Sequence, residues 1–284
     1  MKNPILACAL LCACIATAVA AEPQGVLKKI KATKTITLGY SESAVPFSFA
    51  GSDGRPQGYS VDLCKRVADG IQQQLGLADL AVKWVKVDVQ TRIPLVAKGK
   101  VDIECGTTTH TLTREEKVDF SLLTFVDGGS FLTKARSKLS KVKDLDGKRV
   151  GVIPGTTTET VLEAALERAH VSAEIVPVKI HADGVSALRE GTIDAYASDR
   201  MILFGLVFGA IDVASYALSD EMFSYEPYGL MMRRDADFRL AVNRELARIY
   251  RSGEIMDIYA RWYGALGDPS TLLKAMYFLN ALPE

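Results

Sequence analysis

The sequence of 284 residues has no surplus of charge of either sign, since 34 lysine and arginine residues balance 34 aspartate and glutamate residues. No overall field therefore draws the chain to nucleic acid or to a charged membrane surface, and we expect a small molecule as the ligand. The chain also lacks a Ser/His/Asp set, a Cys/His cluster with metal-ligand spacing and a glycine-rich phosphate loop. These absences leave no catalytic residue, no metal site and no cofactor to predict.

Long apolar runs are also missing after the N-terminus. There, an early lysine precedes an apolar run over residues 5–21 that ends in small residues. This pattern predicts a secretory signal peptide over residues 1–21, cleaved after Ala21, and hence an exported chain. The run is short for a membrane span. Leu11–Cys14 loosely resembles a lipoprotein cleavage box, so a lipid anchor on Cys14 is the alternative that the sequence leaves open.

Cysteine is scarce, and three of the five cysteines lie in the predicted signal peptide, which leaves Cys64 and Cys105. An exported chain with two cysteines can form one disulfide. The spacing does not decide between a bridge and two buried thiols. Cys64 falls on the apolar face of a helix that we predict to be capped by Ser60, so its side chain is expected to face the core.

A β-α-β-α-β order occurs twice, over residues 35–105 and again over residues 149–197. The motif Gly-x-Ψ-Asp, in which Ψ is apolar, ends at Asp102 in the first copy and at Asp194 in the second. Its glycine supplies the left-handed residue that ends a helix. The repeat predicts an α/β fold of two similar lobes, each with a mostly parallel sheet flanked by helices.

Two extended segments, Phe125–Thr133 and Tyr225–Met232, connect the two copies, and the chain after the second returns to helices. A chain that leaves one lobe, builds the other and comes back forms a two-strand hinge. The expected division is a signal peptide of residues 1–21, a first lobe of residues 22–127 plus 231–284, and a second lobe of residues 128–230 that includes the hinge strands.

Hydroxyl-bearing and charged residues follow the strands of both copies. Ligands of open parallel sheets lie beyond the carboxyl ends of the strands, and Thr107 and Asp199 each stand five residues after the repeated aspartate. Thr107 opens a threonine-rich run that ends at Arg114, whose guanidinium can bind a carboxylate by two parallel bonds. Asp199 can bind an ammonium group, so the pair suits a zwitterion. The alternative is a solvated threonine-rich turn with a surface arginine.

Two helix starts border the expected cleft. The stretch Thr113-Arg-Glu-Glu116 has the spacing of a capping box, which predicts a helix beginning at Thr113. Thr156 and Glu159 have the same spacing in the second copy. Thr157 would then present its hydroxyl and its backbone N–H at the positive end of a helix, where anionic groups bind.

The sequence resembles the periplasmic amino-acid-binding proteins of ABC importers, family 3 of the solute-binding proteins, over nearly all of the chain after the signal peptide. The glutamate/aspartate-binding branch of that family is the most similar. The resemblance implies a periplasmic monomer that closes on an amino acid and docks on a membrane permease. The motifs that carry it are Gly58–Asp62, Thr107–Arg114 with Asp119–Ser121, Asp144–Val152 with Gly155–Thr157, and Asp199, and for the branch Ser43–Ser48, Gln90–Pro94 and Glu104–Thr109.

The resemblance also implies roles for individual residues. The α-ammonium of the ligand would be bound by Asp199. The α-carboxylate would be bound by Arg114 together with three hydroxyl-bearing residues, Thr107, Thr109 and Thr157.

In the glutamate/aspartate-binding branch, two arginines and a histidine bind the side-chain carboxylate of the ligand, which we call the distal carboxylate. Arg92 and His181 stand at two of these places, but Ser41 replaces the other arginine. The loss of one cation admits glutamine, asparagine or another polar ligand beside glutamate and aspartate. Arg92 could instead be a surface residue at a helix start, and His181 a loop histidine satisfied by its neighbours. We interpret the remaining candidates as structural: Glu104, Cys105, His110 and His170.

Two further functions stay open. Cyclohexadienyl dehydratases, which act on prephenate or arogenate, resemble these binding proteins. Such an enzyme would need an acid beside the leaving hydroxyl, for which Glu104 or His181 could be proposed. A sensor ectodomain would need a membrane span that the sequence does not offer. The expected function is binding without catalysis.

Overall fold

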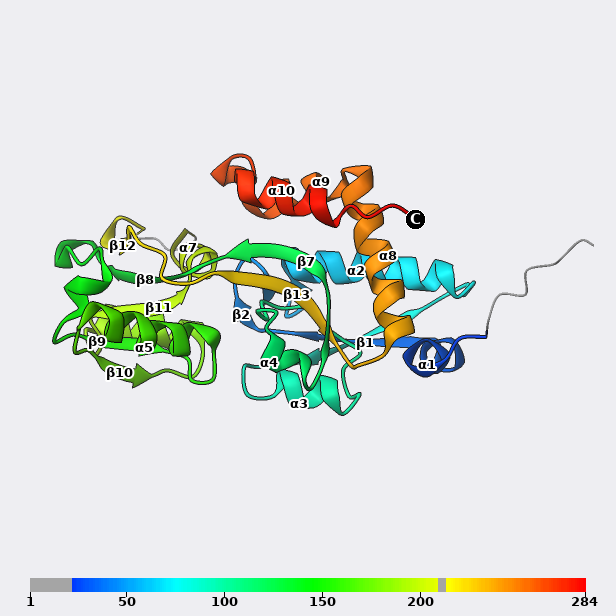
Figure 1. The fold of residues 1–284 in the computed structure, drawn as a ribbon, viewed down its shortest axis with the longest axis horizontal. Coiled ribbons are helices and arrows are strands. Elements are labelled where there is room, and N and C mark those ends of the chain that lie inside the picture. Colours follow the sequence, from blue (N-terminus) through cyan, green and yellow to red (C-terminus); the bar gives the residue numbers. More distant parts are fainter. Residues whose placement is uncertain (1–21, 209–212) are drawn as a thin grey trace, which may run out of the picture.

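The computed structural model describes residues 22–208 and 213–284. The predicted signal peptide and the alternative lipid anchor at Cys14 therefore lie outside the described residues. The chain forms two α/β lobes connected by long strands (Figure 1). Within these two ranges, no helix is long and apolar enough to cross a membrane.

The first lobe contains a five-stranded sheet in the order β5-β1-β6-β13-β7 and a small sheet in the order β2-β3-β4. The β5–β1 and β1–β6 pairs are parallel, whereas β13 runs antiparallel to both β6 and β7. The strands are β1 (Thr35–Tyr40), β2 (Ser43–Ala44), β3 (Ser48–Ala50), β4 (Pro56–Gln57), β5 (Ala81–Lys86), β6 (Ile103–Glu104), β7 (Asp119–Asp127) and β13 (Glu226–Met232). The α-helices are α1 (Gly25–Thr33), α2 (Tyr59–Gln74), α3 (Arg92–Ala97), α4 (Leu112–Glu115), α8 (Ala236–Ser252), α9 (Glu254–Tyr263) and α10 (Thr271–Asn280).

The second lobe repeats this plan with the order β10-β9-β11-β8-β12. Its β10–β9 and β9–β11 pairs are parallel, and β8 runs antiparallel to both β11 and β12. The strands are β8 (Gly129–Lys134), β9 (Arg149–Val152), β10 (Glu174–Pro177), β11 (Ala195–Asp199) and β12 (Tyr216–Leu218). The α-helices are α5 (Thr157–Ala169), α6 (His181–Glu190) and α7 (Arg200–Phe208).

The predicted two-lobed α/β fold is confirmed, and the repeat explains its symmetry. In each lobe the parallel pairs come from the repeated β-α-β-α-β unit, because a helix returns the chain to the same edge between consecutive strands. The antiparallel pairs come from the strands next to the hinge, which makes each sheet mixed. Gly99 and Gly191 have φ values of 65° and 82°, the left-handed conformation predicted for them.

The chain crosses between the lobes twice. β7 continues into β8 through Gly128, and residues 219–225 connect β12 to β13 (Figure 1). β13 pairs with strands of the first sheet from Glu226 to Met232. The division at residues 127–128 and 230–231 stays a prediction, and we propose from this pairing that the second crossing lies before Glu226.

Two contacts from α2 fix the chain directly after β6. Cys64 and Cys105 form a disulfide with their Cα atoms 6.0 Å apart, which settles the alternative left by their spacing. Ser60 was predicted to cap α2, but the helix begins one residue earlier and the Ser60 hydroxyl donates to the carbonyl of Gly106 at 2.8 Å. Residues 60 and 64 lie on the same face of a helix. Together they hold the start of the threonine-rich loop.

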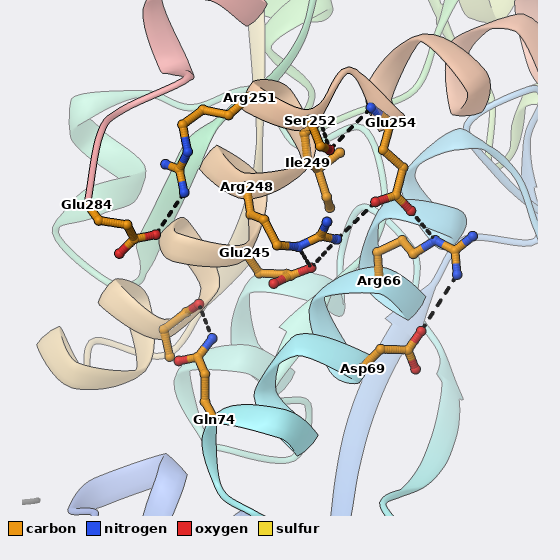
Figure 2. A network of polar contacts seen from close by, with 11 residues as sticks. Arg66, Asp69, Gln74, Glu245, Arg248, Ile249, Arg251, Ser252, Glu254 and Glu284 are labelled. Atoms are coloured by element: carbon orange, nitrogen blue, oxygen red, sulfur yellow. Dashed lines mark hydrogen bonds and ion pairs between the residues drawn. The ribbon is translucent and has the colours of Figure 1, made fainter.

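A network of ion pairs joins the helices on the outer side of the first lobe (Figure 2). Glu254 of α9 pairs with Arg66 of α2 at 2.7 Å and with Arg248 of α8 at 2.9 Å. Arg248 also pairs with Glu245, which is 7% exposed, at 2.6 Å. Ion pairs in a network of this kind are worth more than isolated surface pairs. The network ties the C-terminal helices to the helix that positions the site.

Candidate functional site

Two neighbouring cavities lie between the lobes, at the carboxyl ends of the parallel strands. The inner cavity has a volume of about 30 Å³ and the outer cavity one of about 330 Å³, and Val89 and His181 line both. The inner cavity brings together six of the predicted residues, three from each lobe: Arg92, Thr107, Thr109, Thr157, His181 and Asp199. Ser41 lines the outer cavity.

Arg92 begins α3, and its side chain is only 8% exposed. Its Nε has no hydrogen-bond partner among the described residues, although the residue lines the inner cavity. A buried charged group is costly unless it is paired. Glu104 is the nearby acid, but burial raises the pKa of its carboxyl above the usual range and Thr108 donates to it at 2.8 Å. Arg92 therefore presents an unsatisfied donor to an anion in the cavity.

Arg114 is not among the residues that line the two cavities, but its Nη1 donates to the carbonyl of Thr109, a lining residue, at 2.7 Å. Burial, and next the neighbouring Arg92, lower the pKa of this guanidinium to about 10, so it remains charged at neutral pH. The helix α4 that carries Arg114 does not begin at the predicted Thr113. Thr111 is its N-cap and accepts the backbone N–H of Arg114 at 3.2 Å, because its extended backbone ends the loop two residues earlier.

Glu226 is a site residue that the sequence did not reveal. It begins β13, is 1% exposed, and accepts hydrogen bonds through one oxygen from Thr109 at 2.6 Å and from Thr157 at 2.7 Å. Its other oxygen accepts from Ser224 at 2.6 Å. Glu226 is the only acid in the predicted extended segment Tyr225–Met232. That position was the signal available in the sequence.

Asp199 ends β11 and is 6% exposed. One carboxylate oxygen accepts from the hydroxyl of Thr158 at 2.8 Å, and the other accepts a short hydrogen bond from Tyr228 of β13. Burial, and next the Glu226 carboxylate, raise the pKa of Asp199 to about 6. The hydrogen bonds from Tyr228 and Thr158 and the charge of Arg92 lower the pKa of Asp199 and offset only part of this rise.

Asp127 ends β7 and is the cross-strand partner of Glu226. It accepts the backbone N–H of Met201 at 3.0 Å, at the start of α7. Burial, and next Asp199, raise the pKa of Asp127 to about 8. Three acids from the hinge and the second lobe thus lie close together.

His181, predicted as a ligand-binding residue, is the first residue of α6 and not the loop histidine of the alternative interpretation. Its Nδ1 lies 2.8 Å from the hydroxyl of Tyr196, and burial, followed by Arg92, lowers its pKa to about 4. The imidazole is therefore neutral at physiological pH and can contact a ligand as a hydrogen-bonding group, not as a cation. Thr107 also lines the inner cavity. Ser41 donates its backbone N–H to Ser48 at 3.0 Å.

The histidines interpreted as structural lie outside both cavities. His110 pairs with Glu115 at 2.9 Å and stacks on Phe120 with ring centroids 4.6 Å apart. His170 has φ 54° and forms the left-handed cap of α5. Among the described residues, no group of three or more His, Cys, Asp or Glu side chains could hold a metal ion.

Residues 36–265 match the family described as bacterial extracellular solute-binding proteins, family 3. The L-glutamate/L-aspartate-binding protein of Pseudomonas aeruginosa is 38% identical over 250 residues, which cover 87% of this chain and 83% of that protein. The glutamate/aspartate import solute-binding protein of Salmonella typhimurium is 33% identical over 238 residues, covering 84% and 79%. An ancestral arginine-binding protein bound to glutamine superposes with a TM-score of 0.72 at 27% identity, covering 81% and 98%. The names of these proteins describe binding and import, not catalysis.

Proposed function

Because the chain belongs to the bacterial extracellular solute-binding proteins of family 3, we propose that it captures an acidic L-amino acid, glutamate or aspartate, between its lobes. The observation that carries this proposal is Arg92. Arg92 is 8% exposed, lines the inner cavity and has an Nε without a hydrogen-bond partner among the described residues, so its buried charge favours an anionic group in that cavity. The two most similar relatives named above bind glutamate and aspartate.

The charges of the site favour a ligand with two negative ends and one positive end. Arg114 takes the α-carboxylate, Asp199 takes the α-ammonium, and Arg92 takes the distal carboxylate. Charge-assisted hydrogen bonds contribute about 1.5–3 kcal/mol each. Three such contacts approach the roughly 8 kcal/mol that micromolar binding requires. Thr107, the neutral His181 and, toward the outer cavity, Ser41 then supply neutral polar contacts around the ligand.

Ligand capture requires the lobes to part and close. The inner cavity is lined by residues of both lobes, so the ligand enters when the two crossing segments bend. A ligand that touches Arg92 of the first lobe and Asp199 of the second lobe binds the closed form better than the open form, which drives closure. We propose that the closed protein, exported as a monomer to the periplasm, delivers its ligand to an ABC permease, with no nucleic acid as a partner.

A panel of ligands tests the function. We expect L-glutamate and L-aspartate to raise the thermal unfolding midpoint of the purified protein, because a ligand that binds only the folded state stabilises it. L-Glutamine and L-asparagine should raise it less. Arg92→Ala should remove the preference for the acid over its amide.

The matched control is Arg189→Ala, which removes an exposed arginine of α6 and should leave the preference unchanged. A protein that responds equally to an acid and its amide, or to neither, would contradict the proposal.

A further inference from the structure

Glu226 fixes the direction in which two hydroxyl groups of the cleft can donate. A threonine hydroxyl has one hydrogen to donate and lone pairs to accept with. Thr109 and Thr157 both donate that hydrogen to the same oxygen of Glu226, at 2.6 and 2.7 Å. Their own oxygens lie 3.1 Å apart, within hydrogen-bond distance, so the two hydroxyl hydrogens are used among these two threonines and Glu226. The two hydroxyls therefore offer lone pairs, not hydrogens, to a group in the inner cavity.

The carboxylates of Glu226 and Asp199 are held by neighbouring residues of the same two elements. Thr157 donates to Glu226, and Thr158 donates to Asp199 at 2.8 Å. On the hinge strand, Tyr228 stands two residues after Glu226, hence on the same face, and donates to Asp199. The repulsion between the two carboxylates contributes to the raised pKa of Asp199. A ligand cation between them would relieve that repulsion.

Two cationic donors lie near these acids. Arg92 lines the inner cavity, and Arg114 is held by the carbonyl of Thr109, which also lines it. The site is thus divided into a half that donates, built by two guanidinium groups, and a half that accepts. In the accepting half lie the carboxylates of Asp199 and Glu226 and the lone pairs of two threonine hydroxyls.

We propose that Glu226 is a specificity-determining residue that holds the hydroxyls of Thr109 and Thr157 so that their lone pairs, together with Asp199, bind the α-ammonium group of the ligand. The proposal rests on the proposed function and refines it, because it makes a free ammonium group a requirement. It also moves Thr109 and Thr157 from the carboxylate, where the family resemblance places them, to the ammonium. Dicarboxylic acids without an amino group are then excluded even though both arginines could bind them.

The test compares L-glutamate with glutarate, which has the same two carboxylates and no ammonium group. Isothermal titration should show that the wild-type protein binds L-glutamate at least tenfold more tightly than glutarate. Glu226→Gln retains the shape and one hydrogen-bond acceptor, replaces the other oxygen by an NH2 group, and removes the charge. We expect this substitution to lower the affinity for L-glutamate at least tenfold and to change the affinity for glutarate less than threefold. Glu226→Asp, which retains the charge, should keep part of the preference for L-glutamate.

Glu221→Gln is the matched control, since Glu221 is exposed and accepts the backbone N–H of Val142 at 2.9 Å, away from both cavities. It should leave both dissociation constants unchanged. Equal weakening of both ligands by Glu226→Gln would overturn the inference, because it would make Glu226 a structural tie between the lobes. Tighter binding of both would also overturn it, because Glu226 would then compete with the ligand carboxylate. Failure of the wild-type protein to bind any amino acid would overturn the proposed function itself.

Discussion

The hydroxyl oxygens of Thr109 and Thr157 lie 3.1 Å apart, although Thr109 belongs to the first lobe and Thr157 to the second. In the proposed opening and closing of the lobes, this contact forms on closure, since each residue is fixed to its own sheet. Closure would therefore bring together the acceptor groups of the site. The distance between the two hydroxyl oxygens then distinguishes the closed from the open form.

Thr157→Val should weaken amino-acid binding about tenfold. The substitution removes one of three hydroxyl donors to the buried Glu226 carboxylate, and an unsatisfied buried acceptor costs about 1–3 kcal/mol. The cost falls on the closed form, because the open form exposes Glu226 to water. Titration calorimetry measures the change in affinity. Thr160→Val, an exposed position of the same helix, should have no effect.

Ligand affinity should fall as the pH is lowered from 7.5 to 5. The free-site pKa of Asp199 is about 6, and the protonated carboxyl offers no charge to the ligand ammonium. One pH unit below that pKa only about a tenth of the sites are ionised, so the affinity at pH 5 should be about tenfold lower.

His181→Asn should keep this fall with pH, because the pKa of His181 at about 4 places its titration below the range. Asp199→Asn should bind weakly at every pH between 5 and 8. An affinity of the wild-type protein that is constant over this range would show that Asp199 does not contact the ammonium group.

Asp127→Asn should stabilise the ligand-free protein at pH 8 and have less effect at pH 5. Burial raises the folded-state pKa of Asp127 to about 8, above its unfolded value, so the folded protein binds the proton more tightly. The resulting stability is present at low pH and is lost as the pH rises through 8. An asparagine removes that loss and its oxygen still accepts the N–H of Met201, but it gives up the hydrogen bond from the N–H of Gly128, so we expect a net gain of about 1 kcal/mol.

Thermal unfolding at both pH values measures this difference. Asp53→Asn, at an exposed loop position, is the control and should shift neither midpoint by an appreciable amount. A variant that is less stable at pH 8 than the wild-type protein would contradict the assignment.

Removal of the disulfide should destabilise the first lobe by about 2–4 kcal/mol. The bridge closes a loop of 41 residues, and the conformational freedom of the reduced unfolded chain grows accordingly. The double variant Cys64→Ala/Cys105→Ala should unfold at a lower temperature and should no longer respond to a reducing agent. A wild-type midpoint that does not change on reduction would show that the bridge is absent in solution.

The lobes and most of the cavity could be predicted from the sequence because they follow from periodicity. Alternating apolar residues define the strands, the repeated Gly-x-Ψ-Asp motif aligns the lobes, and strand ends give Thr107 and Asp199. The bridge could not be predicted, because two cysteines are compatible with either redox state until the fold places their Cα atoms 6.0 Å apart.

Glu226 and Tyr228 escaped prediction for a different physical reason. Both lie in a segment that was correctly predicted to be extended, but β13 begins at Glu226 itself, so the two side chains project from the strand and not from a loop. Whether they face the cleft depends on the register with β7, which shifts twice along this pair of strands. A single sequence carries no record of such irregularities.

The placement of Glu226 and Tyr228 on β13 affects how the ligand would be released. In the proposed opening, the segment that bends leads directly into Glu226, which accepts from Thr157, and Tyr228, which donates to Asp199. A transporter that separates the lobes would therefore move these two residues of the binding site at the same time. We expect release of the amino acid in a single step, because the motion that exposes it to the transporter also moves the acidic residues away from its ammonium group.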